Sequence, residues 1–250
     1  MYYRNLPHIN NYYWITIFVA SVCGANTGDY VSHNLHLGHI DGLLPLSVIL
    51  ALIFYIEKLC RFITVAYYWL AIIVLRTAAT NIADLITHDF RINYIYFIIL
   101  ITIFMIVIIL FDQWRSNKLH FLPTTKSIIK FPKTNFFYWL IMLLAGILGT
   151  TLGDYVADEL GIGVVYGSIE LVSLLILVIW LIGRYATRTI FLYWLVIVTA
   201  RTAGTVVGDC IASKHGLNLG LPLSTTVTTV IFILLIFLFT FNKKNHNEVL

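Results

Sequence analysis

Long apolar stretches fill almost the whole chain and are separated by short polar segments. Most of them run for roughly 20 residues, the length a helix needs to cross the hydrocarbon core of a bilayer. The chain therefore has the pattern of an all-α integral membrane protein with eight transmembrane helices. The predicted spans are residues 12–34, 43–56, 63–87, 92–111, 136–157, 161–182, 190–212 and 219–241.

A Tyr-Trp pair followed by an aspartate recurs four times. The Asp lies fifteen residues after the Trp in every copy, and the copies are offset by 55, 70 and 55 residues. This spacing indicates two duplicated halves, each with two repeats. Each repeat comprises two predicted helices. The Trp and Asp pairs are Trp14 and Asp29, Trp69 and Asp84, Trp139 and Asp154, and Trp194 and Asp209.

The spacing and composition divide the chain into three parts. Residues 1–111 form an N-terminal membrane half with repeats 1 and 2, and residues 136–250 form a C-terminal membrane half with repeats 3 and 4. Residues 112–135 contain five Lys or Arg and two Pro, so we expect a basic cytoplasmic linker there.

Composition excludes a soluble domain. The chain is 60% apolar and 11% charged, and its mean hydropathy is +0.88, whereas soluble domains are about half apolar and a quarter charged. Its three cysteines have neither disulfide-framework nor zinc-module spacing. The basic residues follow the loops rather than one face, so we expect a lipid bilayer and no nucleic acid as partner.

The distribution of Lys and Arg predicts the topology. Twelve of the sixteen would lie on the side that holds both termini, so we expect cytoplasmic N and C termini. The four two-helix repeats would then be parallel. The first apolar stretch could also be read as a cleavable signal peptide, but its match to three internal copies argues against cleavage.

Six charged residues fall inside the predicted spans at repeated positions. An Asp or Arg deep in a span costs about 2.5–3.5 kcal/mol, so these residues should converge on the bundle interior. Arg76 and Arg201 lie eight residues, or roughly 12 Å, before the Asp of the same helix. We therefore expect them to compensate carboxylates of neighbouring repeats. The simplest interpretation is a set of structural pairs that hold helices together, with repeated glycines allowing close approach.

The charge balance favours a cation site. Four Asp against two Arg leave two uncompensated carboxylates, and crowded carboxylates in a low dielectric take up protons or bind a cation. Neutral oxygens on the same helices would add ligands. The predicted substrate-binding residues are Asp29, Asp84, Asp154, Asp209, Glu170, Thr80, Thr205, Asn26 and Asn81, with Arg76 and Arg201 as compensating charges.

Side chains one turn beyond the aspartates suggest a divalent metal. His33 and His88 follow an Asp at i+4, and Asp158 follows Asp154 in the same way. Oxygen ligands with optional imidazole suit Mn²⁺ or Mg²⁺. The metal would be the substrate, and no resident cofactor is expected. The predicted metal ligands are Asp29, Asp84, Asp154, Asp209, His33, His88 and Asp158, although a His at the outer end of a span is commonly just interfacial.

Two local features carry further expectations. The Tyr-Trp pairs are typical of an interfacial aromatic belt, here at the cytoplasmic boundary. The Gly-Asp pairs are expected to interrupt their helices, and an interrupted helix at membrane depth lines a cavity or is buried in protein.

The repeated Tyr-Trp…Arg-Thr-Ala-Gly-Thr…Gly-Asp, with Gly-Asp-Tyr-Val-Ala-Asp-Glu-Leu-Gly-Ile-Gly after Leu152, resembles a family of bacterial uncharacterised membrane-anchored proteins built from a short repeat of unknown function. The second copy departs from the motif, with Ala83 in place of Gly. The resemblance implies a bacterial inner (plasma) membrane location and implies no reaction.

The first functional hypothesis is a secondary transporter or exporter of a small cation, such as Mn²⁺. The alternative is a noncatalytic membrane scaffold with structural intramembrane salt bridges. An intramembrane enzyme is the weakest hypothesis, because no catalytic or nucleotide-binding motif occurs and the carboxylates come in symmetric repeats. The sequence leaves a homo-oligomer open.

Overall fold

The computed structural model describes residues 7, 9–59, 65–119, 134–185 and 190–247, and all of the regular structure in them is helical. Three π-helical turns extend the first, third and fifth helices. The elements are α1 (Asn11–Asp29), η1 (Tyr30–Asn34), α2 (Gly38–Leu59), α3 (Val65–Asp84), η2 (Leu85–Asp89), α4 (Tyr94–Leu119), α5 (Phe136–Asp154), η3 (Tyr155–Glu159), α6 (Val164–Tyr185), α7 (Ile190–Ala212) and α8 (Gly220–Asn247).

In the described part of the chain seven helices, α2 to α8, are long and apolar enough to cross a membrane, which indicates a multi-pass membrane protein as the sequence predicts. The helix α1 differs because it carries polar residues such as Thr16, Ser21 and Asn26. Neighbouring helices bury all three of these side chains. An enclosed helix does not need an apolar surface, because it does not face lipid.

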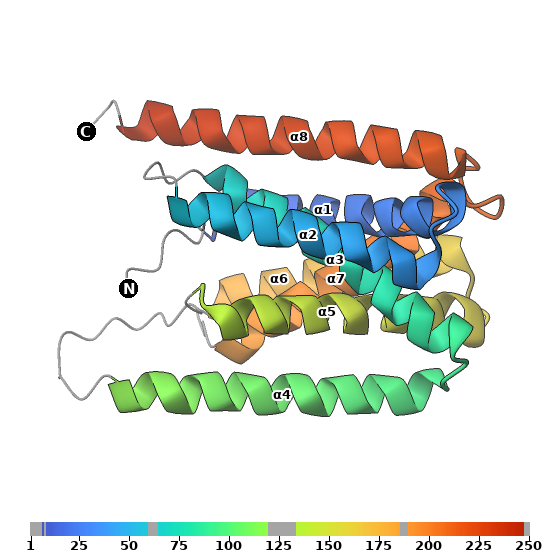
Figure 1. Cartoon of the computed structure of the whole chain (residues 1–250), viewed down its shortest axis with the longest axis horizontal. Helices are drawn as coiled ribbons and strands as arrows, with labels where there is room; N and C mark the ends of the chain where they lie inside the picture. The colour runs from blue at the N-terminus through green and yellow to red at the C-terminus, as the bar shows by residue number, and fades with distance from the viewer. Residues whose placement is uncertain (1–6, 8, 60–64, 120–133, 186–189, 248–250) are drawn as a thin grey trace.

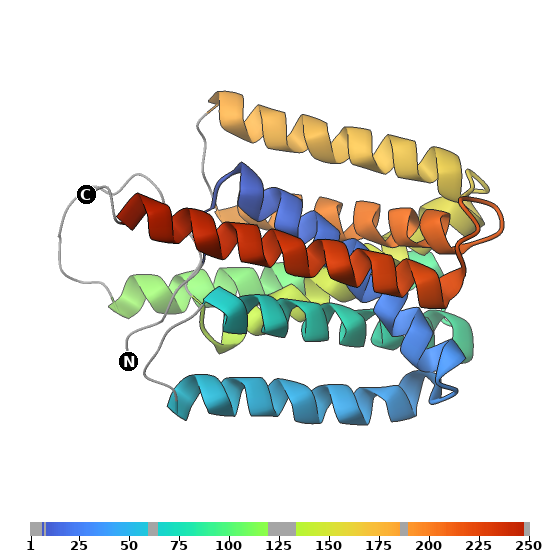
Figure 2. The same cartoon turned by 90° about the horizontal axis from the view of Figure 1, so that it is seen from above.

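The helices form an inner and an outer set. In the best spanning windows of α3, α5 and α7, 61–72% of the residues are buried, against 11–22% in α2, α4, α6 and α8. The inner helices contact in a closed order, α1 with α3, α3 with α5, α5 with α7 and α7 with α1. In Figure 1 α8 and α4 lie at opposite sides of this inner set, and Figure 2 shows α6 and α2 at the other two sides.

Each outer helix packs on the inner helix of the following copy more closely than on the inner helix of its own copy. The pairs are α2 with α3, α4 with α5 and α6 with α7, and α8 completes the circle on α1. The two helices of one repeat are thus joined by a short turn but do not pack as a hairpin. Because the outer helix of each copy packs on the inner helix of the next copy, no repeat buries its apolar surface alone.

Small residues set the spacing of the inner helices. A Cβ added at Gly24 would lie 2.7 Å from the Cβ of Arg76 on the next inner helix, and one added at Gly146 would lie 2.6 Å from the Cβ of Ala79. Gly149 meets Arg201 and Gly204 meets Ser21 in the same way. The close approach expected from the repeated glycines therefore occurs at three of the inner interfaces, and Gly146 provides it at the fourth, between α3 and α5.

The helices are not interrupted at the aspartates, so that prediction is wrong. Each of α1, α3 and α5 continues through its Asp and then widens into a π-helical turn, whereas α7 continues as an ordinary helix to Ala212. The reason is that the Asp keeps helical backbone angles, as at Asp154 (φ −63°, ψ −41°). The chain turns later, where His36, Arg91, Gly161 and Asn218 have positive φ.

The two ends of the predicted linker, residues 112–135, can be compared with the helices of the structure. The helix α4 continues to Leu119, so residues 112–119 of the predicted linker are helical, and α5 begins at Phe136 as expected. Residues 120–133 of the linker lie outside the described residues.

We predict that Gly149→Ala lowers the free energy of unfolding by about 1–3 kcal/mol, the usual cost of overpacking. The added methyl group would overlap the Cβ of Arg201 and lie 2.9 Å from its carbonyl carbon. Gly183→Ala on α6 is the matched control, because nothing lies within 4 Å of a Cβ there. Thermal unfolding of the purified proteins in detergent checks this. Equal stability of the two variants would contradict the close packing of α5 on α7.

Candidate functional site

The four repeated aspartates lie at one level, near the end of the inner bundle where the turns leading into the outer helices lie. Asp84 is 7% and Asp154 8% exposed, whereas Asp29 and Asp209 are partly buried. Their carboxyl groups are near enough to act on one another electrostatically. One carboxylate from each inner helix therefore contributes to a shared acidic end of the bundle.

The expected pairing of arginines with these aspartates is wrong. In the described part of the chain neither Arg76 nor Arg201 comes within ion-pair distance of a carboxylate, and the close charged pairs there involve histidines. Both arginines are nevertheless fully buried, with an exposure of 0%. Two helical turns separate each arginine from the Asp of its own helix, and other side chains occupy the level between them.

Threonines hold Arg76. Its Nη1 donates to Oγ1 of Thr80 at 2.8 Å and of Thr150 at 2.6 Å, and its Nη2 donates to Oγ1 of Thr205 at 2.6 Å. The three hydroxyls come from α3, α5 and α7 at the same position of their copies, eleven residues after the Trp. Arg76 therefore reaches the bundle axis and ties three inner helices together, with Thr80 and Thr205 bound to it.

Arg201 has no such set of acceptors. Its Nε, Nη1 and Nη2 are all buried without a hydrogen-bond partner in the described residues. Four tyrosines lie near it, on the side of the bundle away from the aspartates.

Those tyrosines form a closed ring of hydrogen bonds. All four side chains are buried, with exposures of 5% or less. The aromatic side chain of each tyrosine also packs on the Trp of the next copy, as for Tyr138 and Trp194, whose ring centroids lie 5.4 Å apart. The hydroxyl contacts are Tyr13 to Tyr68 (2.8 Å), Tyr68 to Tyr138 (2.7 Å), Tyr138 to Tyr193 (2.8 Å) and Tyr193 to Tyr13 (2.6 Å).

The prediction that the Tyr-Trp pairs form an interfacial belt is therefore wrong for the tyrosines. An interfacial tyrosine places its hydroxyl in water, whereas these four satisfy one another inside the bundle. The indoles of Trp69 and Trp194 are also buried, and Trp14 and Trp139 are half-buried. The tyrosine ring closes the bundle axis at the end opposite the aspartates.

Three further predicted site residues are Glu170, Asn26 and Asn81. Glu170 is exposed on the outer helix α6, so its predicted membership of the central site is wrong. The side chain of Asn26 is directed toward the outer helix α8, where its Nδ2 donates a hydrogen bond to Oγ of Ser224. Asn81 is fully buried, and its amide has no partner in the described residues.

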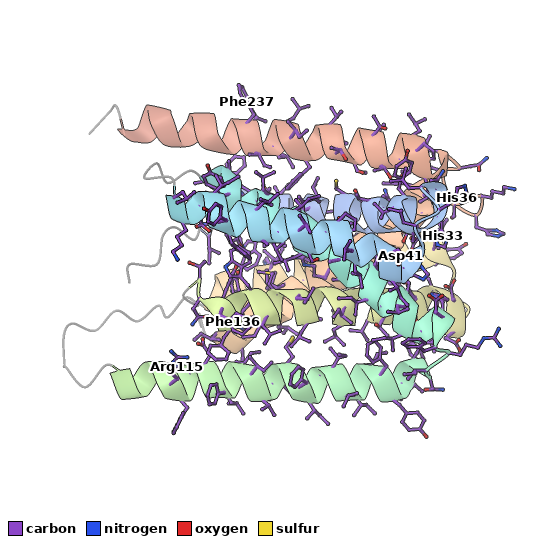
Figure 3. The ribbon with its side chains drawn as sticks, viewed as in Figure 1. His33, His36, Asp41, Arg115, Phe136 and Phe237 are labelled. Atoms are coloured by element: carbon purple, nitrogen blue, oxygen red, sulfur yellow. The ribbon has the colours of Figure 1, made fainter. Side chains whose placement is uncertain are left out.

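The predicted metal ligands beyond the aspartates are arranged unequally. His88 Nδ1 lies 3.9 Å from Asp84 Oδ1, as the i+4 spacing suggests. His33 is exposed and packs edge-on against His39, and Asp158 is exposed. Figure 3 shows His33 at the same end as His36 and Asp41, opposite Arg115. Within the described residues no group of three or more His, Cys, Asp or Glu is close enough to hold a metal ion.

The tyrosine ring and the π-helical turns were not predicted, yet a signal for the ring exists. Each Tyr lies sixteen residues before the Asp of its copy, so it continues the same row of every fourth residue. In the second copy this row is Tyr68, Ile72, Arg76, Thr80 and Asp84. The π-helical turns have no equally clear signal in the residue pattern.

We predict that Tyr138→Phe destabilises the protein by about 1–3 kcal/mol, because it leaves the buried hydroxyls of Tyr68 and Tyr193 each with one lost partner. Tyr166→Phe is the control, since Tyr166 is 70% exposed on α6. Thermal unfolding in detergent measures both variants. If Tyr138→Phe is as stable as the control, the ring does not contribute to stability.

A family model described as a Repeat of Unknown Function (DUF347) matches this chain three times, at residues 12–61, 137–188 and 192–245. The three matches correspond to the first, third and fourth copies of the Tyr-Trp and Asp pattern. The second copy, which has Ala83 before its Asp, is not among the matched segments. No curated protein and no solved structure matches the chain.

Proposed function

The chain belongs to the DUF347 repeat family, and we propose that it is a secondary transporter or exporter of a small divalent cation such as Mn²⁺. The observation that carries the proposal is the convergence of four carboxylates, none of which forms an ion pair with an arginine in the described residues. Asp29, Asp84, Asp154 and Asp209 come from all four inner helices and act on one another. Such a set has a strong electrostatic preference for a cation.

The arrangement suits an ion that keeps part of its water shell. Small divalent ions such as Mg²⁺ dehydrate reluctantly and are commonly held by one or two carboxylates together with waters. The described residues provide separate carboxylates rather than a preformed cluster of three ligands. A hydrated cation could be shared among them, and His88 beside Asp84 could add an imidazole ligand.

Access to the carboxylates supports transport rather than permanent storage. Asp29 and Asp209 are partly exposed at their end of the bundle, whereas the tyrosine ring is buried at the other end. A carrier needs this asymmetry, with its site open to one side while the other side is closed. Opening the tyrosine ring would then connect the site to the other side of the membrane. π-Helical turns are frequent at functional sites, and three of them directly follow the aspartates.

The proposal assigns the chain a place and an orientation. It would lie in a bacterial plasma membrane as two duplicated halves of parallel two-helix repeats, with both termini in the cytoplasm. In this orientation the aspartates face outward. The protein would need no cofactor and would not act as an enzyme, because its charged groups repeat symmetrically and serve a bound ion.

We predict that Asp154→Asn and Asp209→Asn abolish Mn²⁺ transport, because each removes one charge from the shared site and keeps nearly the same shape. Asp41→Asn is the control, since Asp41 is exposed on α2 and lies outside the site. Proteoliposomes with a trapped Mn²⁺-sensitive dye report transport, and size-exclusion chromatography reports folding. Unchanged transport in the folded variants would reject the proposal and favour the noncatalytic scaffold, whose charges are only structural.

We also predict that reporter fusions after residues 60, 125, 186 and 245 all report the cytoplasm. The reason is that twelve of the sixteen Lys and Arg would lie on that side. Fusions after residues 37, 92, 162 and 217 should report the opposite side. A reproducible external signal from any fusion of the first set would contradict the proposed orientation.

A further inference from the structure

We propose that Arg201 binds a small monovalent anion, such as chloride, on the bundle axis. The site would lie between the tyrosine ring and the threonine-bound Arg76. It is separate from the proposed cation site, because Arg201 is two helical turns from Asp209 along α7. It also holds independently of the proposed transport activity.

The first observation is that the charge of Arg201 is left without a partner. Its side chain is 0% exposed, and all three guanidinium nitrogens lack a hydrogen-bond acceptor in the described residues. A buried charge without a partner is strongly unfavourable. A guanidinium group stays ionised in proteins, so Arg201 cannot avoid this energetic cost by losing its proton. An anion would supply both the acceptor and the opposite charge.

The second observation is that the neighbouring hydroxyls already have partners. Thr205 lies one turn beyond Arg201, but its Oγ1 accepts from Arg76 and donates to the Arg201 carbonyl oxygen at 3.2 Å. On the other side, each tyrosine hydroxyl of the ring contacts two others, so each can donate one hydrogen bond and accept one. Neither Thr205 nor the tyrosine ring provides an anionic group.

A second positive charge strengthens the case. Arg76 is buried on α3, and the charge of Arg201 acts on it directly. The Nε of Arg76 also lacks a partner in the described residues. Two like charges on one axis repel each other, and a single anion at this level would offset the repulsion as well as the burial of Arg201.

The surroundings favour a small ion. The residues at the same repeat position as Arg76 and Arg201 are Ser21 and Gly146, whose side chains are small or absent. Neither side chain is long enough to reach a partner on the axis. Close packing limits the space around Arg201, since a Cβ at Gly149 would already lie 2.9 Å from the Arg201 carbonyl carbon. A halide fits these limits better than sulfate or phosphate.

The test is the chloride dependence of thermal unfolding. Purified full-length protein in detergent is titrated with sodium chloride against sodium gluconate at constant ionic strength. An anion that binds only the folded state raises the midpoint of unfolding in a saturable way. We expect a rise of several degrees for the wild type and for Arg115→Gln, whose parent side chain is exposed on α4. The rise should disappear in Arg201→Gln.

Equilibrium binding of radiolabelled chloride to the wild type keeps the proposal testable if Arg201→Gln does not fold. We expect a single saturable site that bromide displaces and sulfate does not. Asp209→Asn should retain this site, which separates it from the proposed cation site. Absence of saturable binding, displacement by sulfate, or an equal chloride effect in folded Arg201→Gln would each overturn the proposal.

Discussion

The structure depends on one constraint, which is that an ionised side chain cannot face the hydrocarbon of a bilayer at low cost. The repeated row of this chain contains six such side chains, so all four helices that carry them must turn the row inward. The outer helices then supply the apolar surface. This division explains why α3, α5 and α7 are mostly buried, and why α1 can hold Thr16, Ser21 and Asn26.

Helix geometry explains how one row can line the whole axis. Residues four apart drift around a straight helix, so Tyr193 and Asp209 would lie on nearly opposite faces. Such a row is inclined by about 26° to the helix axis, and helices that pack along these rows cross obliquely. In Figure 2 α1 runs obliquely across its neighbours. The tilt brings tyrosine, arginine, threonine and aspartate successively to the centre.

The sequence predicted the helical membrane architecture because apolar length and repeat spacing are direct signals of it. Partner choice within the bundle was harder to predict. The charge pattern predicts that Arg76 meets a carboxylate, but Arg76 donates hydrogen bonds to threonines of three helices instead. The spacing within one helix does not show which side chains of neighbouring helices meet. Glu170 has the charge of the aspartates and lies within a predicted span, but its helix is an outer one. The tyrosine ring required the row to be followed beyond the charged residues.

The central claim is that the four aspartates act as one cation site, and Mn²⁺ binding tests it most directly. Electron paramagnetic resonance of purified protein measures free and bound Mn²⁺ without any need for transport. The account predicts a saturable Mn²⁺ site in the wild type. This site should be lost in the double variant in which Asp29 and Asp154, on different inner helices, are both changed to Asn. Wild-type protein that binds no Mn²⁺, or Mn²⁺ binding that survives both changes, would contradict it.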